Sequence, residues 1–350
     1  MKLINYHEKD MNEIVRNIGV NSESLVNFYG YEEEVERDNV IDLSHPFYHE
    51  NALVSFLYRL VYLHCYAKLP IEKCFSVSKR NVEVDSQFLK KLQSANPSES
   101  RWSRNWRVIY CFRNGVAATR KSRVRIFYQG QFLASEPRAQ IRKGDIIHCF
   151  NSHESTSLQR DFYYVFGDFF DTDIDSSKTL RIYFNLKASE AAAAISHLSF
   201  ELNRVHIPFT LKCLNSPALY GRADSGVLYV AKHDYRSVLG VLSQLQSEIF
   251  RWCESDRPLF SHKLAPGVGI AESPVSDSFG GYCSRVIAEA LYGCFEQNLH
   301  TQKLKCYEVK RQLFYAGINM ASPYIVSASG YEDSLTAMNA IDVSLTDKEG

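Results

Sequence analysis

Two features are missing from this 350-residue chain: a cysteine pair spaced for metal or disulfide chemistry, and a long apolar run. Its nine cysteines are an odd number, and none forms a CxxC pair. This pattern predicts reduced thiols and no zinc site. No run approaches the roughly 18 apolar residues of a membrane span, and the start, MKLINYHEKDMNEIV, lacks the apolar core of a signal peptide. We therefore expect a cytoplasmic protein with neither a metal nor a membrane partner.

Net charge is also missing, because 40 basic residues balance 40 acidic ones. No overall electrostatic bias towards nucleic acid follows, so we expect no nucleic-acid partner. No glycine-rich phosphate loop follows a predicted strand, which disfavours an ATP-using kinase and leaves no organic cofactor to expect. Hydrophobic residues make up 45% of the chain, enough to bury a sizeable core.

The first hundred residues are predicted to be mostly helical. Helices are expected at residues 11–20, at 51–66 and near 85–92, where apolar residues recur at intervals of three and four. The charged stretch YEEEVERDN between the first two is expected to be a solvated loop or helix. We predict a helical N-terminal region over 1–100, an α+β domain over 101–325 and a C-terminal tail over 326–350.

From residue 101 the sequence changes to short β-branched and aromatic runs. RWSRNWRVIYCF, RVRIFYQGQFL and IRKGDIIHCF predict antiparallel strands. This stretch is locally basic, with arginines interleaved among aromatic residues. Such alternation indicates either the solvated face of a sheet or a binding surface, for which a peptide is favoured over nucleic acid.

The remainder predicts an α+β fold with a mixed, mainly antiparallel sheet flanked by helices. Strands are expected in DFYYVFGDFF, LRIYFNL, residues 209–214 and 227–230. Ser189 and Asp234 are placed to cap the helices that follow them, the second running to Trp252. Residues 258–280 are expected to form a long irregular loop because they contain several Gly and Pro residues, with helices beyond it.

Residues 209–232 bring four chemically useful groups into a short stretch. Alternation directs Lys212 away from Phe209 on the first strand, and Tyr220, Arg222 and Asp224 follow in the turn. One interpretation is a binding or catalytic loop at the end of a rigid sheet. The other is an ordinary surface ion pair beside a core tyrosine and a solvated lysine.

Several motifs together resemble the HopA family of type III secretion effectors, including its stand-alone bacterial relatives. The matching pieces are RIYFNL, ELNRVHIPFTLK, YGRADSGVLY, PLFSHKLAPGVGIAESP and SFG, in this order over about residues 100–297. The N-terminal helices match only loosely.

The resemblance implies two functions that differ in kind. Relatives in lanthipeptide and thioamitide clusters are carbon–oxygen lyases that act beside a kinase-like protein. They eliminate phosphate from phosphothreonine or phosphoserine of a precursor peptide and leave a dehydroamino acid. Plant-pathogen members are effectors exported through the type III apparatus, for which a non-catalytic role in protein–protein interaction is equally consistent. Formation of the thioether ring is a third, weaker alternative.

For the lyase, elimination needs a base, an acid for the leaving group and cations around the phosphate. A desolvated lysine beside other cations can act as such a base, and Lys212 is the candidate. Arg181 and Arg222 are expected to grip the phosphate. Protonation of the leaving group is assigned to Tyr220 or His262, and Asp224 is expected to orient an arginine or the substrate amide. Lys263 is an alternative base or phosphate ligand.

Glu272, Ser278 and Gly280 also fall on motif positions, as supporting loop residues. The resemblance predicts an arginine three residues after Gly280, where this chain has Cys283. If that arginine holds phosphate, the lyase activity is in doubt. Arg285 cannot simply replace it, because two helical positions turn a side chain by about 200°. Cys283 itself is either a nucleophile at a helix N-terminus or a buried small hydrophobe.

Overall fold

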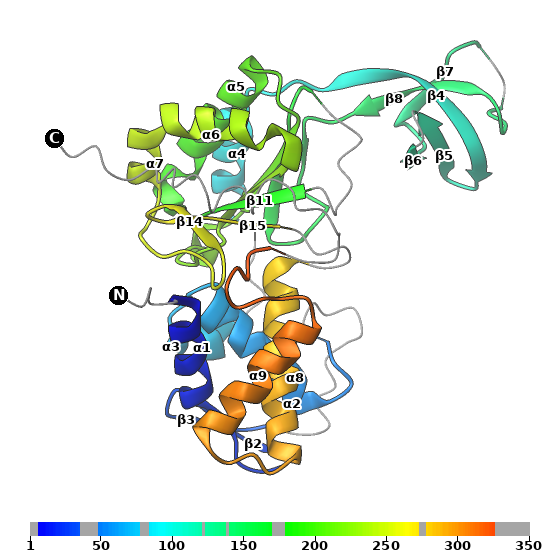
Figure 1. Cartoon of the computed structure of the whole chain (residues 1–350). Helices are drawn as coiled ribbons and strands as arrows, with labels where there is room; N and C mark the ends of the chain where they lie inside the picture. The colour runs from blue at the N-terminus through cyan, green and yellow to red at the C-terminus, as the bar shows by residue number, and fades with distance from the viewer. Residues whose placement is uncertain are drawn as a thin grey trace.

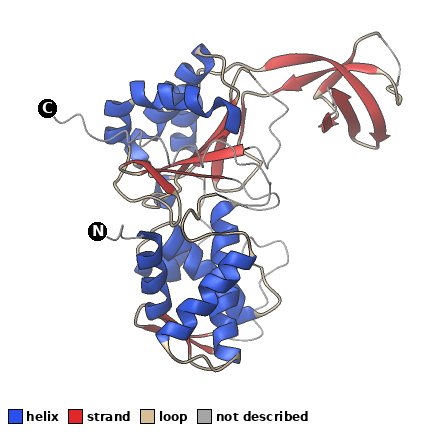
Figure 2. Cartoon of the chain, in the orientation of Figure 1, coloured by secondary structure: helices blue, strands red, loops and turns tan. Residues whose placement is uncertain are grey.

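The computed structural model of the chain describes residues 6–35, 48–77, 84–120, 123–137, 140–169, 179–272 and 278–325. Within them it has three parts: a helical body, a central sheet with helices on one side, and an arm built from strands (Figures 1 and 2). The predicted tail, 326–350, lies outside the described residues. No helix of the described part is both long and apolar enough to cross a membrane.

The helical body joins segments from both ends of the chain, shown in blue and orange in Figure 1. Met11, Leu57, Ile287 and Leu313 are buried in one common core. Its elements are α1 (Tyr6–Asn17), α2 (Ala52–Leu60), the π-helix Val61–Tyr66, α3 (Ile71–Val77), α8 (Phe279–Glu296) and α9 (Gln302–Tyr315), with a small sheet of β1 (Ile18–Val20), β2 (Leu25–Phe28) and β3 (Tyr31–Glu34). The predicted boundaries at residues 100 and 325 stay predictions.

Two expectations for this body were wrong in detail. The charged stretch that begins at Tyr31 starts as strand β3, because it pairs with β2 along its whole length. The helix expected over 51–66 changes after Leu60 into a π-helix, in which the N–H of Ala67 bonds to the carbonyl of Tyr62 at 2.8 Å. The π-helix is rare, and π-turns inside helices occur frequently at functional sites.

The central sheet has the strand order β14-β15-β11-β13-β12-β10-β9, and every pair among the described strands is antiparallel. The strands are β9 (Glu154–Ser155), β10 (Phe162–Phe166), β11 (Thr179–Phe184), β12 (Phe209–Leu214), β13 (Gly226–Ala231), β14 (His262–Ala265) and β15 (Val268–Glu272). One face packs against α4 (Ser86–Ala95), α5 (Ala191–Arg204), α6 (Tyr235–Gln244) and α7 (Gln246–Trp252) in a shared core. The α+β prediction is confirmed.

One turn and the starts of two helices differ from what the sequence predicts. The loop expected over 258–280 contains the β14–β15 hairpin, whose turn requires glycine: Gly267 has φ +72°, and an added Cβ would lie 1.9 Å from the Glu254 carbonyl oxygen. The predicted cap at Ser189 was wrong, whereas Asp234 does occupy the N-cap position of α6. Ser189 lies inside a short 3-10 turn before α5, and Asp234 precedes the helical residues but makes no side-chain cap bond. The following helix is interrupted at Leu245.

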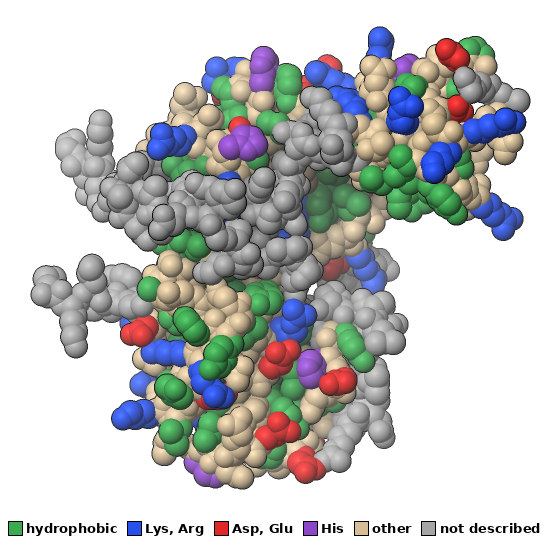
Figure 3. All heavy atoms as spheres, turned by 45° about the vertical axis from the view of Figure 1, so that its right-hand side comes forward, with side chains coloured by type: hydrophobic (Ala, Val, Ile, Leu, Met, Phe, Trp, Pro, Cys, Tyr) green, Lys and Arg blue, Asp and Glu red, His purple; other side chains and the backbone are tan. Residues whose placement is uncertain are grey.

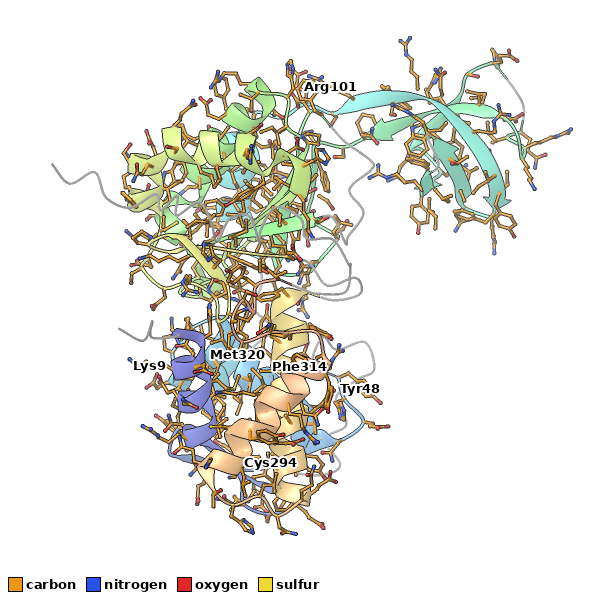
Figure 4. All side chains as sticks on the ribbon, in the orientation of Figure 1. Lys9, Tyr48, Arg101, Cys294, Phe314 and Met320 are labelled. Carbon is orange, nitrogen blue, oxygen red and sulfur yellow. The ribbon has the colours of Figure 1, made fainter. Side chains whose placement is uncertain are left out.

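The arm is a separate sheet with the strand order β6-β5-β4-β8-β7 and its own small core around Trp106. Its strands are β4 (Arg101–Phe112), β5 (Gly115–Arg120), β6 (Arg123–Tyr128), β7 (Phe132–Ala134) and β8 (Ile146–Asn151). Arg101 marks the point where β4 leaves the body of the molecule, and its guanidinium pairs with Asp168 at 3.2 Å (Figure 4). The expected strands are confirmed, but β5 was not predicted because GVAATR consists largely of small residues.

Candidate functional site

Two cations, Arg181 and Lys212, lie near each other on the face of the central sheet that points away from α5 and α6. Burial alternates along β12, so that Lys212 lies opposite to the buried Phe209, as predicted. The strand register places Lys212 between Tyr164 and Val227, and it places Arg181 beside Tyr229. Because cross-strand neighbours share a face, all these side chains lie on the same side of the sheet.

Lys212 is held by aromatic rings and an amide. Its Nζ lies 4.1 Å from the centre of the Phe162 ring, 5.7 Å from that of Tyr164 and 5.8 Å from that of Tyr229. It also donates a hydrogen bond to Oε1 of Gln159 at 3.0 Å. Among the residues that the structure describes, no carboxylate forms an ion pair with Lys212. The amino group is therefore oriented by rings and an amide oxygen.

Arg181 occupies the other side of the same tyrosine. Its Cζ lies 5.4 Å from the centre of the Tyr229 ring. Burial raises the pKa of the neighbouring Tyr183 to about 12, although the charge of Arg181 offsets part of that effect. Since Lys212 and Arg181 flank one ring on a half-buried face, they form a positively charged surface lined with phenols. We call Arg181, Lys212, Tyr164 and Tyr229 the cation–tyrosine face.

Arg222 and Asp224 form a second, buried cluster against the helical body. Nε of Arg222 lies 2.5 Å from Oδ1 of Asp224, and its Nη2 lies 2.7 Å from Oδ2. The hydroxyl of Tyr62 donates to Oδ2 at 2.8 Å. Burial opposes ionisation of Asp224, but the charge and hydrogen bonds of Arg222 outweigh it and keep the pKa of this carboxyl below its usual value. Asp224 thus orients an arginine, one of its two predicted roles, and two nitrogens of Arg222 are already engaged.

The π-helix brings two tyrosines to this interface. Tyr62 and Tyr66 stack with ring centres 5.3 Å apart, and Tyr66 meets Tyr183 of the sheet at 6.2 Å. Burial raises the pKa of both hydroxyls well above the ordinary value. The turn that carries Arg222 is hydrogen-bonded to the end of the same helix: the N–H of Ala223 donates to the Ala67 carbonyl at 2.6 Å.

Three predicted residues lie away from the cation–tyrosine face. The hydroxyl of Tyr220 donates to the Leu214 carbonyl at 2.9 Å inside the core on the opposite face of the sheet. His262 and Lys263 are on the edge strand β14, four strands from β12. At about 4.8 Å per strand, this separation is roughly 19 Å. The structure therefore does not bring these three residues to Lys212.

The predicted supporting residues have structural contacts. Glu272 is buried and pairs with Nζ of Lys232 at 2.9 Å. Ser278 caps α8 by accepting a hydrogen bond from the N–H of Gly281 at 2.9 Å. Gly280 lets α8 approach Tyr66 closely, since an added Cβ would lie 2.2 Å from that ring.

Cys283 is fully buried in the core of the helical body. Its burial fits the small-hydrophobe interpretation rather than a nucleophile, which must reach a substrate. Arg285, two positions further on, lies over the ring of Tyr282 at 6.0 Å. No described group of three or more His, Cys, Asp or Glu residues could hold a metal ion.

Comparison with known proteins supplies a family. Residues 153–325 match the model of the HopA1 effector protein family. This segment, just under half of the chain, is similar to that family, and we call it the HopA1 segment. The HopA1 segment contains the central sheet, both cations of the cation–tyrosine face and the Arg222–Asp224 pair. Tyr62 and Tyr66 come from the helices that precede it.

Two solved structures are similar to the chain. The effector protein from Pseudomonas syringae pv. tomato strain DC3000 is 15% identical, with a TM-score of 0.38 over 68% of this chain and 79% of that one. The effector protein from Pseudomonas syringae pv. syringae strain 61 is 14% identical, with the same TM-score over 78% and 96%. At this level of similarity nothing about the site is transferred from them. No curated protein matches the chain.

Sequence reasoning missed the aromatic part of the site. Tyr229 ends the motif YGRADSGVLY of the HopA1 segment, and alternation with Val227 along β13 is the signal that places it on the face of Lys212. Tyr164 alternates in the same way along β10. The contacts of Tyr62 with residues 160 or more positions away leave no such signal.

Proposed function

We propose that this chain is a phosphothreonine/phosphoserine lyase that acts on a phosphorylated precursor peptide. The observation that carries the proposal is the pairing of Lys212 and Arg181 around the Tyr229 ring on a half-buried face. Two cations that approach one phenol are suited to a phosphate dianion, and a sheet face gives an extended peptide room to lie. The resemblance of the HopA1 segment to lyases of lanthipeptide and thioamitide clusters supports the same reaction.

The proposed reaction is a β-elimination. Lys212 first loses its ammonium proton to solvent. Its neutral amine then takes the Cα proton, the electron pair left behind forms the Cα=Cβ double bond, and the Cβ–O bond breaks. The phosphate leaves with the electrons of that bond, and Arg181 stabilises the charge that develops on it. No electron is gained or lost overall, so the step needs no oxidant or reductant. A kinase must supply the phosphorylated peptide.

Tyr229 is the proposed proton donor to the leaving phosphate, in place of Tyr220 and His262. Its ring lies between Arg181 and Lys212, and in this proposal its hydroxyl reaches a phosphate held by the two side chains. Arg222 acts indirectly in this scheme. It is held by Asp224 and fixes the turn that connects β12 to β13, and so it positions the strands that carry Lys212 and Tyr229.

A second candidate, a non-catalytic peptide-binding or effector role, is favoured by Cys283. The family pattern predicts an arginine there, and this chain has a buried thiol. If that arginine is essential for elimination, the cation–tyrosine face still binds a phosphorylated segment without turning it over. The same experiment separates the two functions.

The test is to incubate the purified protein with a phosphothreonine peptide and follow the peptide mass. The lyase predicts loss of phosphoric acid and a dehydrobutyrine that captures an added thiol. Lys212→Ala is expected to lower the rate by about 10²–10⁴-fold, the range for a lost general base. Lys263→Ala is the matched control: it is an exposed lysine of the same sheet, on the far edge strand, and should keep full activity.

Three outcomes lead to different conclusions. Full activity of Lys212→Ala contradicts the catalytic assignment. An unchanged mass with measurable binding of the phosphopeptide supports the second candidate. If the phosphopeptide is neither converted nor bound, both functions are wrong for this face.

A further inference from the structure

The arm carries an apolar face that its own core does not use. Val108, Val116 and Phe127 are buried on one side of the sheet. On the other side, Tyr110 is 64% exposed and Ile126 is 58% exposed. In Figure 3 hydrophobic side chains gather on the lower side of the arm, with basic side chains beside them.

The strand register shows that this face is continuous. Ile126 of β6 lies opposite Ala117 of β5, which lies opposite Tyr110 of β4. One register step away, Tyr128 and Phe112 flank Gly115, and their rings meet at 6.2 Å. Small residues of β5 therefore separate two rows of large apolar side chains. Exposed apolar side chains that are contiguous in this way mark an interaction surface.

The outer strand of this face is an edge. β6 is the end strand of the arm and pairs with β5 alone among the described strands. An edge strand presents backbone N–H and C=O groups that can pair with an added strand. The N–H of Tyr128 is already bonded to Oε1 of Gln131 at 3.0 Å, so the pairing edge is the part of β6 before Tyr128.

The excess of positive charge around this face indicates an acidic partner. Residues 101–151 contain 11 basic and two acidic residues. Arg107 and Arg113 of this stretch are exposed, and Arg125 alternates with Val124 and Ile126 along β6. A second copy of the arm would bring like charges together, whereas an acidic segment is attracted.

We propose that the arm binds an extended peptide segment in which apolar and acidic residues alternate, as an additional strand on β6. The apolar side chains of the segment extend the row of Val124 and Ile126. Its acidic side chains lie on the face of Arg125. The arm strands precede residue 153, so this surface lies outside the residues that match the family model. The inference does not depend on the lyase proposal, since binding is measured without phosphate.

The experiment is a fluorescence anisotropy titration of the full chain with a labelled peptide of alternating Glu and Val or Ile residues. Ile126→Asp is expected to weaken binding by about tenfold or more, the scale of a lost interface anchor. Arg125→Glu should weaken binding more at low salt than at high salt. The control is Leu304→Asp, an exposed apolar residue of α9 that is 47% accessible, which should leave the affinity unchanged.

Backbone pairing is tested with a peptide of the same sequence that is N-methylated at alternate residues. Loss of binding supports strand addition, and equal binding contradicts it. The proposal is also overturned if Ile126→Asp binds as tightly as the unchanged chain. A single-stranded oligonucleotide that displaces the peptide, or a dimer that Ile126→Asp dissociates, would assign the face to nucleic acid or to a second copy instead. Circular dichroism confirms that each variant is folded.

Discussion

Two arginines of the HopA1 segment, Arg181 and Arg222, lie near the same sheet but have opposite surroundings. Arg222 is bonded twice to Asp224 and faces Tyr62 in the buried contact with the helical body. Arg181 lies over the Tyr229 ring beside Lys212 on a half-buried face. A guanidinium bound to a buried carboxylate stabilises a contact within the fold, whereas the contacts shown for Arg181 are with aromatic side chains.

The difference shows why residue type alone does not assign a role. Both arginines were predicted to grip phosphate, but Arg222 is bonded to the carboxylate of Asp224 in the structure. Asp224 lies two residues from Arg222, in the same turn. If the comparison is right, the Arg222 cluster should govern stability and the cation–tyrosine face should govern binding.

The largest expected effect is that of Asp224→Ala. Removing the carboxylate leaves the buried guanidinium of Arg222 unpaired, which should lower the free energy of unfolding by about 3–5 kcal/mol. Urea denaturation measures this change in the free energy of unfolding. The double variant Arg222→Met with Asp224→Leu should recover most of the loss, because it removes both charges. A double variant as unstable as Asp224→Ala would contradict this explanation.

Gly280→Ala should have the next largest effect. The added Cβ meets the ring of Tyr66, so we expect a loss of about 1–3 kcal/mol from overpacking. Gly293→Ala in the same helix is the matched control, since its nearest neighbour is the end of the Gln297 side chain at 3.8 Å. The control should be neutral or slightly stabilising. Equal destabilisation by the two changes would mean that the contact with Tyr66 is not tight.

A smaller effect is expected in acid. The pKa of Asp224 is below the ordinary 3.8, so its ionisation stabilises the fold above that pH. This contribution is lost as the pH falls through the folded-state pKa. Unfolding free energies measured below pH 3.8 should therefore fall more steeply for the unchanged chain than for the Arg222→Met, Asp224→Leu variant. Parallel curves would show that the pair does not contribute.

The smallest effect on stability should come from Lys212→Met. The substitution removes one hydrogen bond to Gln159 and ring contacts on a half-buried face, and about 1 kcal/mol or less should be lost. Thermal unfolding of Lys212→Met and of Asp224→Ala under the same conditions compares the two losses of stability directly. A loss as large as that of Asp224→Ala would place Lys212 among the structural residues.

Much of the sheet was predictable, because the alternation of buried and exposed side chains along a strand can be recognised within a few consecutive residues. The period of two along β12 placed Lys212 opposite to Phe209, and the same rule applied to Val227 locates Tyr229. The hairpin turn at Gly267 was not predicted, because closely spaced glycine and proline residues are also typical of irregular loops.

The rest of the site depends on topology, which short motifs do not encode. His262 and Lys263 stand in a motif of the resemblance, yet they lie on the edge strand β14, while Lys212 is on β12. Nothing local in the sequence indicates that four strand positions separate them. The approach of Tyr66 to Gly280 is likewise a contact between the two ends of the chain.

The most direct test of the central claim is calorimetric titration with a phosphothreonine peptide and with its unphosphorylated counterpart. The unchanged chain should bind only the phosphorylated form. Arg181→Gln and Lys212→Met should each weaken binding by about tenfold or more, as expected for a lost charge-assisted contact, while Lys263→Ala binds normally. Equal affinity of all three variants for the phosphopeptide would contradict the assignment of phosphate binding to the cation–tyrosine face.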